Sequence, residues 1–232
     1  MATEPEATHW RPYPDPLSLA AALAADVATA LEVALGGQEQ AVLVVSGGRT
    51  PTRFFHALRG STLDWSRVVV VPADERWVPE DDPASNIGLI RRELLQGAAA
   101  RARAVSLTTS APTPHAGQAE VEQRLLALPG PPAALVLGLG EDGHTASLFP
   151  DAPELPAALD SPRLCAAMRP ASQPTPRITL TPRLLGQARW RALHIEGAAK
   201  RATWQRVQAE PEAVAAMPLR ALLAGLHCYW AP

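Results

Sequence analysis

The chain has 232 residues, of which 47% are hydrophobic and 19% are charged, and this composition is typical of a globular protein. That length allows one large domain or two small ones. The formal net charge of −2 argues against a dedicated nucleic-acid or membrane-surface binder, although it leaves room for a local basic pocket that takes a small anion. The two cysteines exclude a disulfide framework and indicate a reducing compartment.

The first residues contain neither a basic region nor an apolar run, so we expect no signal peptide. We also expect no membrane-spanning helix, because no stretch of about 18 uncharged apolar residues occurs. Both points favour a cytoplasmic location. Residues 1–16 are polar and proline-rich, and we predict an irregular lead-in there. Asp15 and Pro16 then have the pattern of a helix cap, and an apolar stripe recurs at every fourth position from Leu19 to Leu35.

Short apolar runs alternate with helical patterns along the rest of the chain. The predicted strands are 41–45, 68–71, 104–107, 133–139, 164–168, 178–180, 192–195 and 227–230. The predicted helices are 51–59, 84–96, 115–128, 198–208 and 213–223. Strand 68–71 consists of four valines, and strands that are apolar on both faces are typical of a mostly parallel sheet with helices on both sides. We therefore predict a single α/β domain over 17–232, with the proline-rich stretch 150–162 as a long loop.

A glycine-rich turn, Ser-Gly-Gly-Arg-Thr-Pro at 46–51, joins the strand at 41–45 to the next helix. Gly47 and Gly48 let the backbone approach a ligand closely, and the N-terminus of the following helix suits a phosphate. Arg49 and Thr50 could contribute to the same site. The turn lacks the Gly-Lys-Ser/Thr ending of a nucleotide P-loop, and a tight connection without a ligand is the alternative.

A charged triplet, Asp74-Glu75-Arg76, comes just after the strand at 68–71. The carboxyl edge of a parallel sheet is where open α/β folds bind ligands, and an arginine there suits a phosphate or a carboxylate. A surface salt-bridge turn is the alternative. Downstream, Asn86 could contribute to the site or cap the following helix.

The longest motif, at 138–150, follows another buried strand and formally contains G-x-G-x-x-G. A dinucleotide-binding interpretation fails on its context, because Pro150 would cut the required helix and Asp160, near the expected acidic position, lies in a proline-rich stretch. The more informative residues are Asp142 and His144. A histidine at a strand end, held by a neighbouring carboxylate, is a general base near neutral pH, and the alternative is a structural histidine.

Two further cations follow predicted strands or open them. Arg177 begins Arg-Ile-Thr-Leu-Thr at 177–181, and Lys200 lies three residues after Gly197. Lys200 is the only lysine in the chain, which indicates either a role for a compact point charge or a GC-rich genome that favours arginine codons. Each cation could otherwise be a solvated surface charge.

Taken together, these motifs resemble the 6-phosphogluconolactonase family in sequence and in order, from about Leu19 to about Leu226. The matching segments are Ser-Gly-Gly-Arg-Thr-Pro at 46–51, Asp-Glu-Arg-Trp-Val-Pro at 74–79, the motif Gly-Leu-Gly-Glu-Asp-Gly-His-Thr-Ala-Ser-Leu-Phe-Pro at 138–150, Arg-Ile-Thr-Leu-Thr at 177–181 and Gly-x-x-Lys at 197–200. The resemblance implies a Rossmann-like three-layer fold that is shared with glucosamine-6-phosphate deaminases. It also implies hydrolysis of 6-phospho-D-glucono-1,5-lactone to 6-phosphogluconate in the pentose phosphate pathway, without a metal or cofactor.

The same resemblance assigns roles to individual residues. His144 becomes the general base and Asp142 its neighbour. The residues expected to bind the substrate are Gly47, Gly48, Arg49, Thr50, Asp74, Arg76, Asn86, Arg177 and Lys200. Which cation meets which substrate oxygen stays open, and the oxyanion donors could be backbone N–H groups of the glycine-rich turn or Arg76.

Two other functions stay open. The related deaminases carry Asn-Glu-Pro after the histidine motif where this chain has Leu148-Phe149-Pro150, so the acid that opens an amino-sugar ring is missing. A non-catalytic sugar-phosphate sensor would keep the phosphate loop without needing His144. The sequence carries no signal for oligomeric state.

Overall fold

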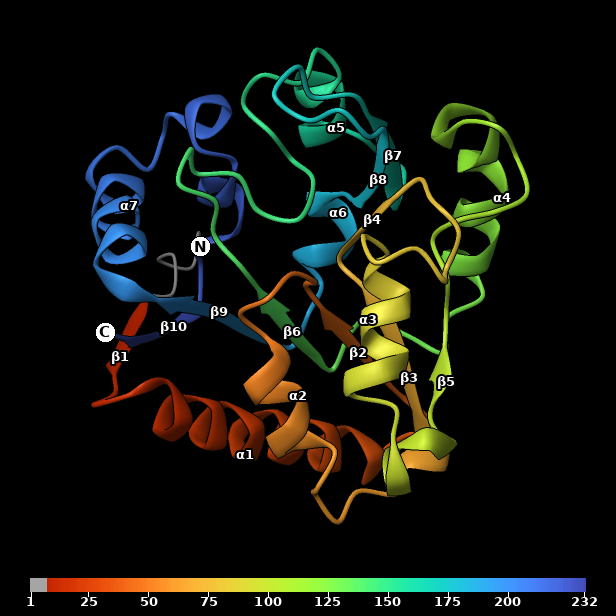
Figure 1. Ribbon diagram of the computed structural model, residues 1–232, viewed down its shortest axis with the longest axis vertical. Coiled ribbons are helices and arrows are strands. Elements are labelled where there is room, and N and C mark those ends of the chain that lie inside the picture. Colours follow the sequence, from red (N-terminus) through yellow and green to blue (C-terminus); the bar gives the residue numbers. More distant parts are fainter. Residues whose placement is uncertain (1–7) are drawn as a thin grey trace, which may run out of the picture.

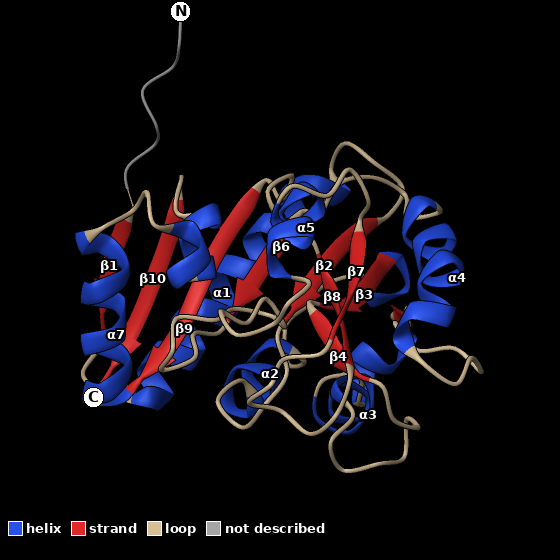
Figure 2. Ribbon diagram, turned by 90° about the horizontal axis from the view of Figure 1, so that it is seen from above, coloured by secondary structure: helices blue, strands red, loops and turns tan. Residues whose placement is uncertain are grey.

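Seven parallel strands form the central sheet of the protein, in the order β1-β10-β9-β6-β2-β3-β5 (Figures 1 and 2). The computed structural model describes residues 8–232. In the order of the sheet, the strands are His9–Pro12, Leu226–Ala231, Trp190–Glu196, Ala134–Leu137, Ala41–Val45, Val68–Pro72 and Arg103–Ala104. Their parallel pairing confirms the predicted sheet, and β5 is shorter than the strand predicted at 104–107.

Helices cover both faces of this sheet, which confirms the predicted α/β fold class. Successive side chains of a strand point to opposite faces. In β3, Val68 and Val70 therefore join one buried core, while Val69 and Val71 join the other. The first core is closed by α1 (Pro16–Leu35), α2 (Thr52–Leu58) and α3 (Asn86–Glu93). The second is closed by α4 (Pro114–Leu126), α6 (Pro182–Leu185) and α7 (Gly197–Ala209).

The first long helix, α1, begins where the sequence predicts it. The Asp15 carboxylate accepts hydrogen bonds from the backbone N–H groups of Leu17 and Ser18 at 2.9 and 2.8 Å, and Pro16 occupies the first turn. By length and composition α1 could cross a membrane, but its apolar stripe is buried against the sheet, as in the core helix of a globular domain. The buried stripe includes Leu19, Leu23, Val27 and Leu31.

Two predictions near the ends of the chain are wrong. The irregular lead-in at 1–16 contains β1, which pairs with β10; residues 1–7 of that prediction lie outside the described residues. The rings of His9 and His227 stack across this pairing, and a partner so distant in sequence leaves no local signal. The helix predicted at 213–223 is instead two 3₁₀ turns, Val214–Ala216 and Pro218–Leu222. Pro218 cannot continue an α-helix because it has no backbone N–H.

A second, three-stranded antiparallel sheet lies outside the parallel one and was not predicted. It is formed by β4 (Asp74–Arg76), β8 (Arg177–Leu180) and β7 (Cys165–Met168), in the order β4-β8-β7. Strands at 164–168 and 178–180 were predicted, whereas β4 is three charged residues without an apolar pattern. A short helix, α5 (Leu155–Leu159), also lies within the stretch predicted as a loop.

Candidate active site

The site lies where the strand order of the central sheet reverses. From β2 the chain continues to β3 and β5 on one side, and then returns to β6, β9 and β10 on the other. The loops that leave the carboxyl ends of β2 and β6 diverge at this point, which is where open α/β folds bind their ligands. The turn at 46–51 follows β2, and the loop that carries His144 follows β6.

A cavity of about 270 Å³ opens between these loops. The structure places ten of the eleven predicted site residues on its wall, namely Gly47, Gly48, Arg49, Thr50, Asp74, Arg76, Asn86, His144, Arg177 and Lys200. Asp142, the eleventh, lies behind His144 and contacts it directly. The residues come from five separate parts of the chain, at 47–50, 74–86, 142–144, 177 and 200, so it is the fold that brings them together.

His144 is held by Asp142 within a tight turn. Its Nδ1 atom lies 2.6 Å from Asp142 Oδ1, and its backbone N–H donates to the same oxygen at 3.1 Å. Partial burial would raise the pKa of the Asp142 carboxyl, but the hydrogen bond and charge of His144 outweigh it, and that pKa lies below its ordinary value. The pair therefore presents a histidine with one ring nitrogen tied and the other directed elsewhere.

The turn around this pair depends on glycine. The Gly140 N–H donates to the His144 carbonyl at 2.8 Å, which folds the chain back on itself. A Cβ at Gly140 would lie 2.0 Å from His144 Nδ1 and 2.5 Å from Asp142 Oδ1. Gly143 has a φ of 86°, a left-handed conformation that L side chains rarely adopt.

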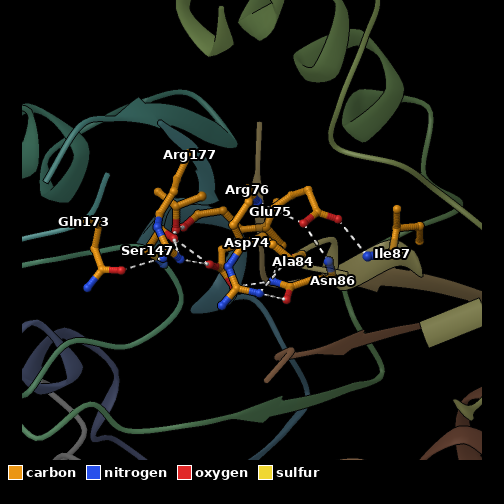
Figure 3. A network of polar contacts seen from close by, with 11 residues as sticks. Asp74, Glu75, Arg76, Ala84, Asn86, Ile87, Ser147, Gln173 and Arg177 are labelled. Carbon is orange, nitrogen blue, oxygen red and sulfur yellow. Dashed lines mark hydrogen bonds and ion pairs between the residues drawn. The ribbon is translucent and has the colours of Figure 1, made fainter. Parts of the chain in front are cut away.

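Asn86 holds two other residues of the cavity wall together (Figure 3). Its Nδ2 group donates to the backbone carbonyl of Asp74 at 2.8 Å and to the Asp74 carboxylate at 3.2 Å. Its Oδ1 atom accepts from Arg76 Nη1 at 2.5 Å. Both ends of the amide are thus engaged within the protein, so Asn86 braces Arg76 and Asp74. Gly47 makes room for it, because a Cβ there would lie 1.9 Å from Asn86 Oδ1.

The second sheet brings the two arginines together. Arg76 in β4 and Arg177 in β8 are register partners in antiparallel strands. Arg177 is 8% exposed, and its Nη1 atom lies 3.7 Å from Asp74. Burial lowers the pKa of Arg177 and the Asp74 charge opposes that change. Ser147 donates from Oγ to Asp74 at 2.5 Å, which completes the network in Figure 3.

Glu75 lies behind this wall and is fully buried. Its carboxylate accepts hydrogen bonds from the backbone N–H groups of Arg76, Asn86 and Ile87 at 2.7–2.8 Å. Burial raises the pKa of Glu75 to about 6, although these three hydrogen bonds oppose the change. Glu75 therefore anchors the start of α3 to β4, and with it the position of Asn86.

Two residues of the cavity wall were missed by the sequence analysis. His194 and Glu196 line the cavity at the end of β9, and His194 Nε2 lies 3.2 Å from Glu196 Oε1. This hydrogen bond lowers the pKa of Glu196. Neither residue was singled out in the sequence analysis. The place of His194 at the carboxyl end of a predicted strand, just before Gly197, was the signal that could have found it.

The arrangement is suited to acid–base chemistry on a small anionic substrate. His144, whose Nδ1 atom is hydrogen-bonded to Asp142, faces the cavity. The cavity wall also contains Arg49, Arg76, Arg177 and Lys200. Within residues 8–232, no three His, Cys, Asp or Glu side chains gather in a way that could hold a metal ion. Fold and site together define an α/β protein whose cavity, at the carboxyl edge of the sheet, is suited to a small phosphorylated or carboxylated molecule.

Comparison with known proteins specifies this class further. A family model described as glucosamine-6-phosphate isomerases/6-phosphogluconolactonase matches residues 14–230. A 6-phosphogluconolactonase of Pseudomonas aeruginosa is 47% identical over 213 residues, covering 90% of this chain and 89% of its own length. One of Pseudomonas putida is 45% identical over 221 residues, covering 94% and 90%. This chain therefore belongs to the family of glucosamine-6-phosphate isomerases and 6-phosphogluconolactonases.

A solved structure gives the same result for the fold. The crystal structure of a 6-phosphogluconolactonase from Shewanella baltica OS155 superposes with a TM-score of 0.95 at 37% sequence identity. The superposition covers 97% of this chain and 98% of the other. The Rossmann-like architecture expected from the sequence is thereby confirmed.

Proposed function

We propose that this chain hydrolyses 6-phospho-D-glucono-1,5-lactone to 6-phosphogluconate, with His144 as the general base. The observation that carries the proposal is the 2.6 Å contact between His144 Nδ1 and Asp142, at a cavity that four cationic side chains line. The relatives described above, which bear the name of this activity, support the choice of substrate. Residues 17–232 would act as one catalytic domain, in the cytoplasm.

The chemistry follows from the lactone being an ester. Water attacks C1 of the lactone while His144, through Nε2, takes a proton from that water. The bond between C1 and the ring oxygen then breaks, and His144 returns the proton to the departing oxygen. Asp142 keeps the ring in the orientation and tautomer that both transfers need. Acid–base catalysis of this kind is worth roughly 10²–10⁴-fold in rate, and this scheme uses water and no cofactor.

The cations have two tasks in this scheme. Holding the phosphate group orients the lactone, so that C1 lies near His144 and the bound water. The oxyanion that forms at C1 needs a fixed donor. The backbone N–H groups of Gly138, Gly140 and Gly143, in the loop that carries His144, are poor candidates because they already donate to other groups of the protein. Arg76, fixed through its bond to Asn86, is the better candidate.

The reaction is tested by offering the purified protein two substrates. Hydrolysis of freshly prepared 6-phosphogluconolactone is followed by coupling to 6-phosphogluconate dehydrogenase, with the spontaneous rate subtracted. Release of ammonia from glucosamine 6-phosphate is measured in parallel. We expect acceleration with the lactone only. Ammonia release at a comparable rate would favour the deaminase, and ligand-induced stabilisation without turnover of either compound would favour a sensor.

A further inference from the structure

We propose that Phe149 is a positioning residue for His144: its ring fixes the plane in which the imidazole meets substrate and water. This inference rests on the proposed role of His144 as base. The centroids of the two rings lie 3.9 Å apart, with an angle of 24° between their planes, so the rings are stacked. Among residues 8–232, this is the one aromatic ring stacked on His144.

The contact supplies a restraint that the hydrogen bond to Asp142 cannot. A single bond at Nδ1 fixes one atom of the imidazole and leaves the ring able to tilt about that atom. The face of Phe149 blocks this tilt from one side. Because 28% of the His144 side chain is exposed, packing from other directions is incomplete. The position of Nε2 therefore depends on both neighbours, Asp142 at the edge and Phe149 at the face.

Phe149 can act in this way because it is itself held. It is 2% exposed and belongs to a small buried cluster that is separate from the two main cores. The other members of this cluster are Leu148, Ala152, Leu155, Ala158 and Met168. They come from the segment before α5, from α5 and from β7. The proline-rich stretch after the histidine motif thus supplies residues that pack around Phe149 and hold its ring against the proposed base.

The same ring also contacts a cation of the cavity wall. The Cζ atom of Arg177 lies 5.2 Å from the centroid of Phe149, within the range of a cation–π contact. Arg177 is held further by Asp74 at 3.7 Å and by Gln173 at 2.9 Å. Figure 3 shows Arg177 directed toward these two partners. Phe149 therefore contacts both the proposed base and a guanidinium that is held in place. It would thereby fix the position of His144 relative to a substrate that Arg177 binds.

The test compares variants that differ in shape at one position. Phe149→Leu keeps an apolar side chain in the cluster but removes the flat face, whereas Phe149→Tyr keeps the face. Leu155→Ala is the matched control, because Leu155 is equally buried in the same cluster but does not supply the ring that stacks on His144. For Phe149→Leu we expect kcat to fall roughly tenfold or more, with KM changed by less than about threefold, since small misplacements of a reacting group are costly. Phe149→Tyr should retain most of the wild-type kcat, and Leu155→Ala should lower the Tm but leave kcat within about twofold.

A spectroscopic measurement separates this proposal from the proposed function. The ring protons of His144, assigned by their absence in His144→Ala, should resonate upfield in the wild type because of the Phe149 ring current. They should move downfield in Phe149→Leu. Wild-type kcat in folded Phe149→Leu, an equal loss of kcat in Leu155→Ala, or unchanged His144 shifts would overturn the positioning role. Absence of lactone hydrolysis by the wild type would instead overturn the proposed function, and the NMR shifts would still decide whether Phe149 fixes the ring.

Discussion

At the scale of single residues, the candidate site depends on glycines, which have no side chain, as much as on reactive residues. Gly140 lies so close to Asp142 and His144 that a methyl group would overlap both side chains. In the loop after β2, Gly47 lies equally close to the side chain of Asn86. The absence of a side chain at these two glycines is required for space and not for backbone conformation, because neither has a left-handed φ.

Gly140→Ala is expected to reduce catalysis without unfolding the protein. The new Cβ would lie 2.0 Å from His144 Nδ1, so the imidazole must move away from Asp142. We expect kcat to fall by at least about tenfold, within the range that acid–base catalysis supplies. The matched control is Gly138→Ala in the same loop, where a Cβ meets no atom within 4 Å. Wild-type activity of Gly140→Ala in the lactone assay would show that the pairing of His144 with Asp142 does not matter.

The sequence patterns indicated which residues lie around the cavity, but they did not show the contacts between those residues. Asp142, His144, Arg49 and Arg76 were found because they follow buried strands, and parallel strands end at a common edge. Asn86 was predicted to bind substrate, and the structure gives it a second role, in which its amide holds Asp74 and Arg76 together. That role depends on three segments meeting in space, which a single sequence does not display.

At the scale of elements, α3 joins the site to the fold through one buried acid. The Glu75 carboxylate accepts hydrogen bonds from the first two backbone N–H groups of α3, those of Asn86 and Ile87. The helix dipole favours a negative charge at this end of a helix. Desolvation is the larger effect, and the pKa of Glu75 is raised to about 6. The ordinary value for a glutamate is 4.5. The start of α3 therefore carries a titratable group whose charge costs stability.

The stability of the protein should depend on pH through Glu75. Between pH 4.5 and about 6 the folded protein keeps a proton that the unfolded chain has released, so the free energy of unfolding decreases as pH rises through this window. The decrease is at most about 2 kcal/mol. Urea unfolding of the wild type and of Glu75→Gln across this range measures it. We expect the difference between the two to change with pH, and parallel curves would refute a raised pKa.

The elements themselves were predictable to different degrees. Strands β2, β3 and β6 are buried on both faces and therefore appear as uninterrupted apolar runs. Strand β4 is three polar residues whose partner, β8, lies far along the chain, so nothing local indicates a strand. The small antiparallel sheet that pairs Arg76 with Arg177 was missed for this reason.

At the scale of the whole molecule, strand order decides which residues share the cavity. In the sheet, β3 lies on one side of β2 and β6 lies on the other. The loops that follow β2 and β6 therefore diverge and leave a cavity between them. Lys200, in the first turn of α7 after β9, reaches the same cavity from the far half of the sheet. The order of the strands is a consequence of long-range packing, and the sequence patterns alone did not predict it.

The single lysine of the chain makes this arrangement testable. An amine-reactive reagent can modify only Lys200 Nζ and the terminal amine, and mass spectrometry distinguishes the two. We expect 6-phosphogluconate to slow labelling of Lys200 several-fold while labelling of the terminal amine stays constant as an internal control. Lys200→Ala should raise KM roughly 10- to 100-fold with little change in kcat, since a hydrogen bond to a charged group is worth about 1.5–3 kcal/mol. If 6-phosphogluconate did not slow labelling of Lys200 and KM were unaltered in Lys200→Ala, Lys200 would have no role in binding. Its being the only lysine would then reflect codon usage.

The central claim, that His144 is the base of a lactonase, is tested most directly by His144→Ala. The measurement is the enzymatic rate with fresh 6-phosphogluconolactone, beside the dissociation constant for 6-phosphogluconate, for the wild type and the variant. We expect kcat to fall by roughly 10²–10⁴-fold while product affinity stays within about threefold, because the cations that bind the anion are untouched. A folded variant with wild-type kcat would contradict the account.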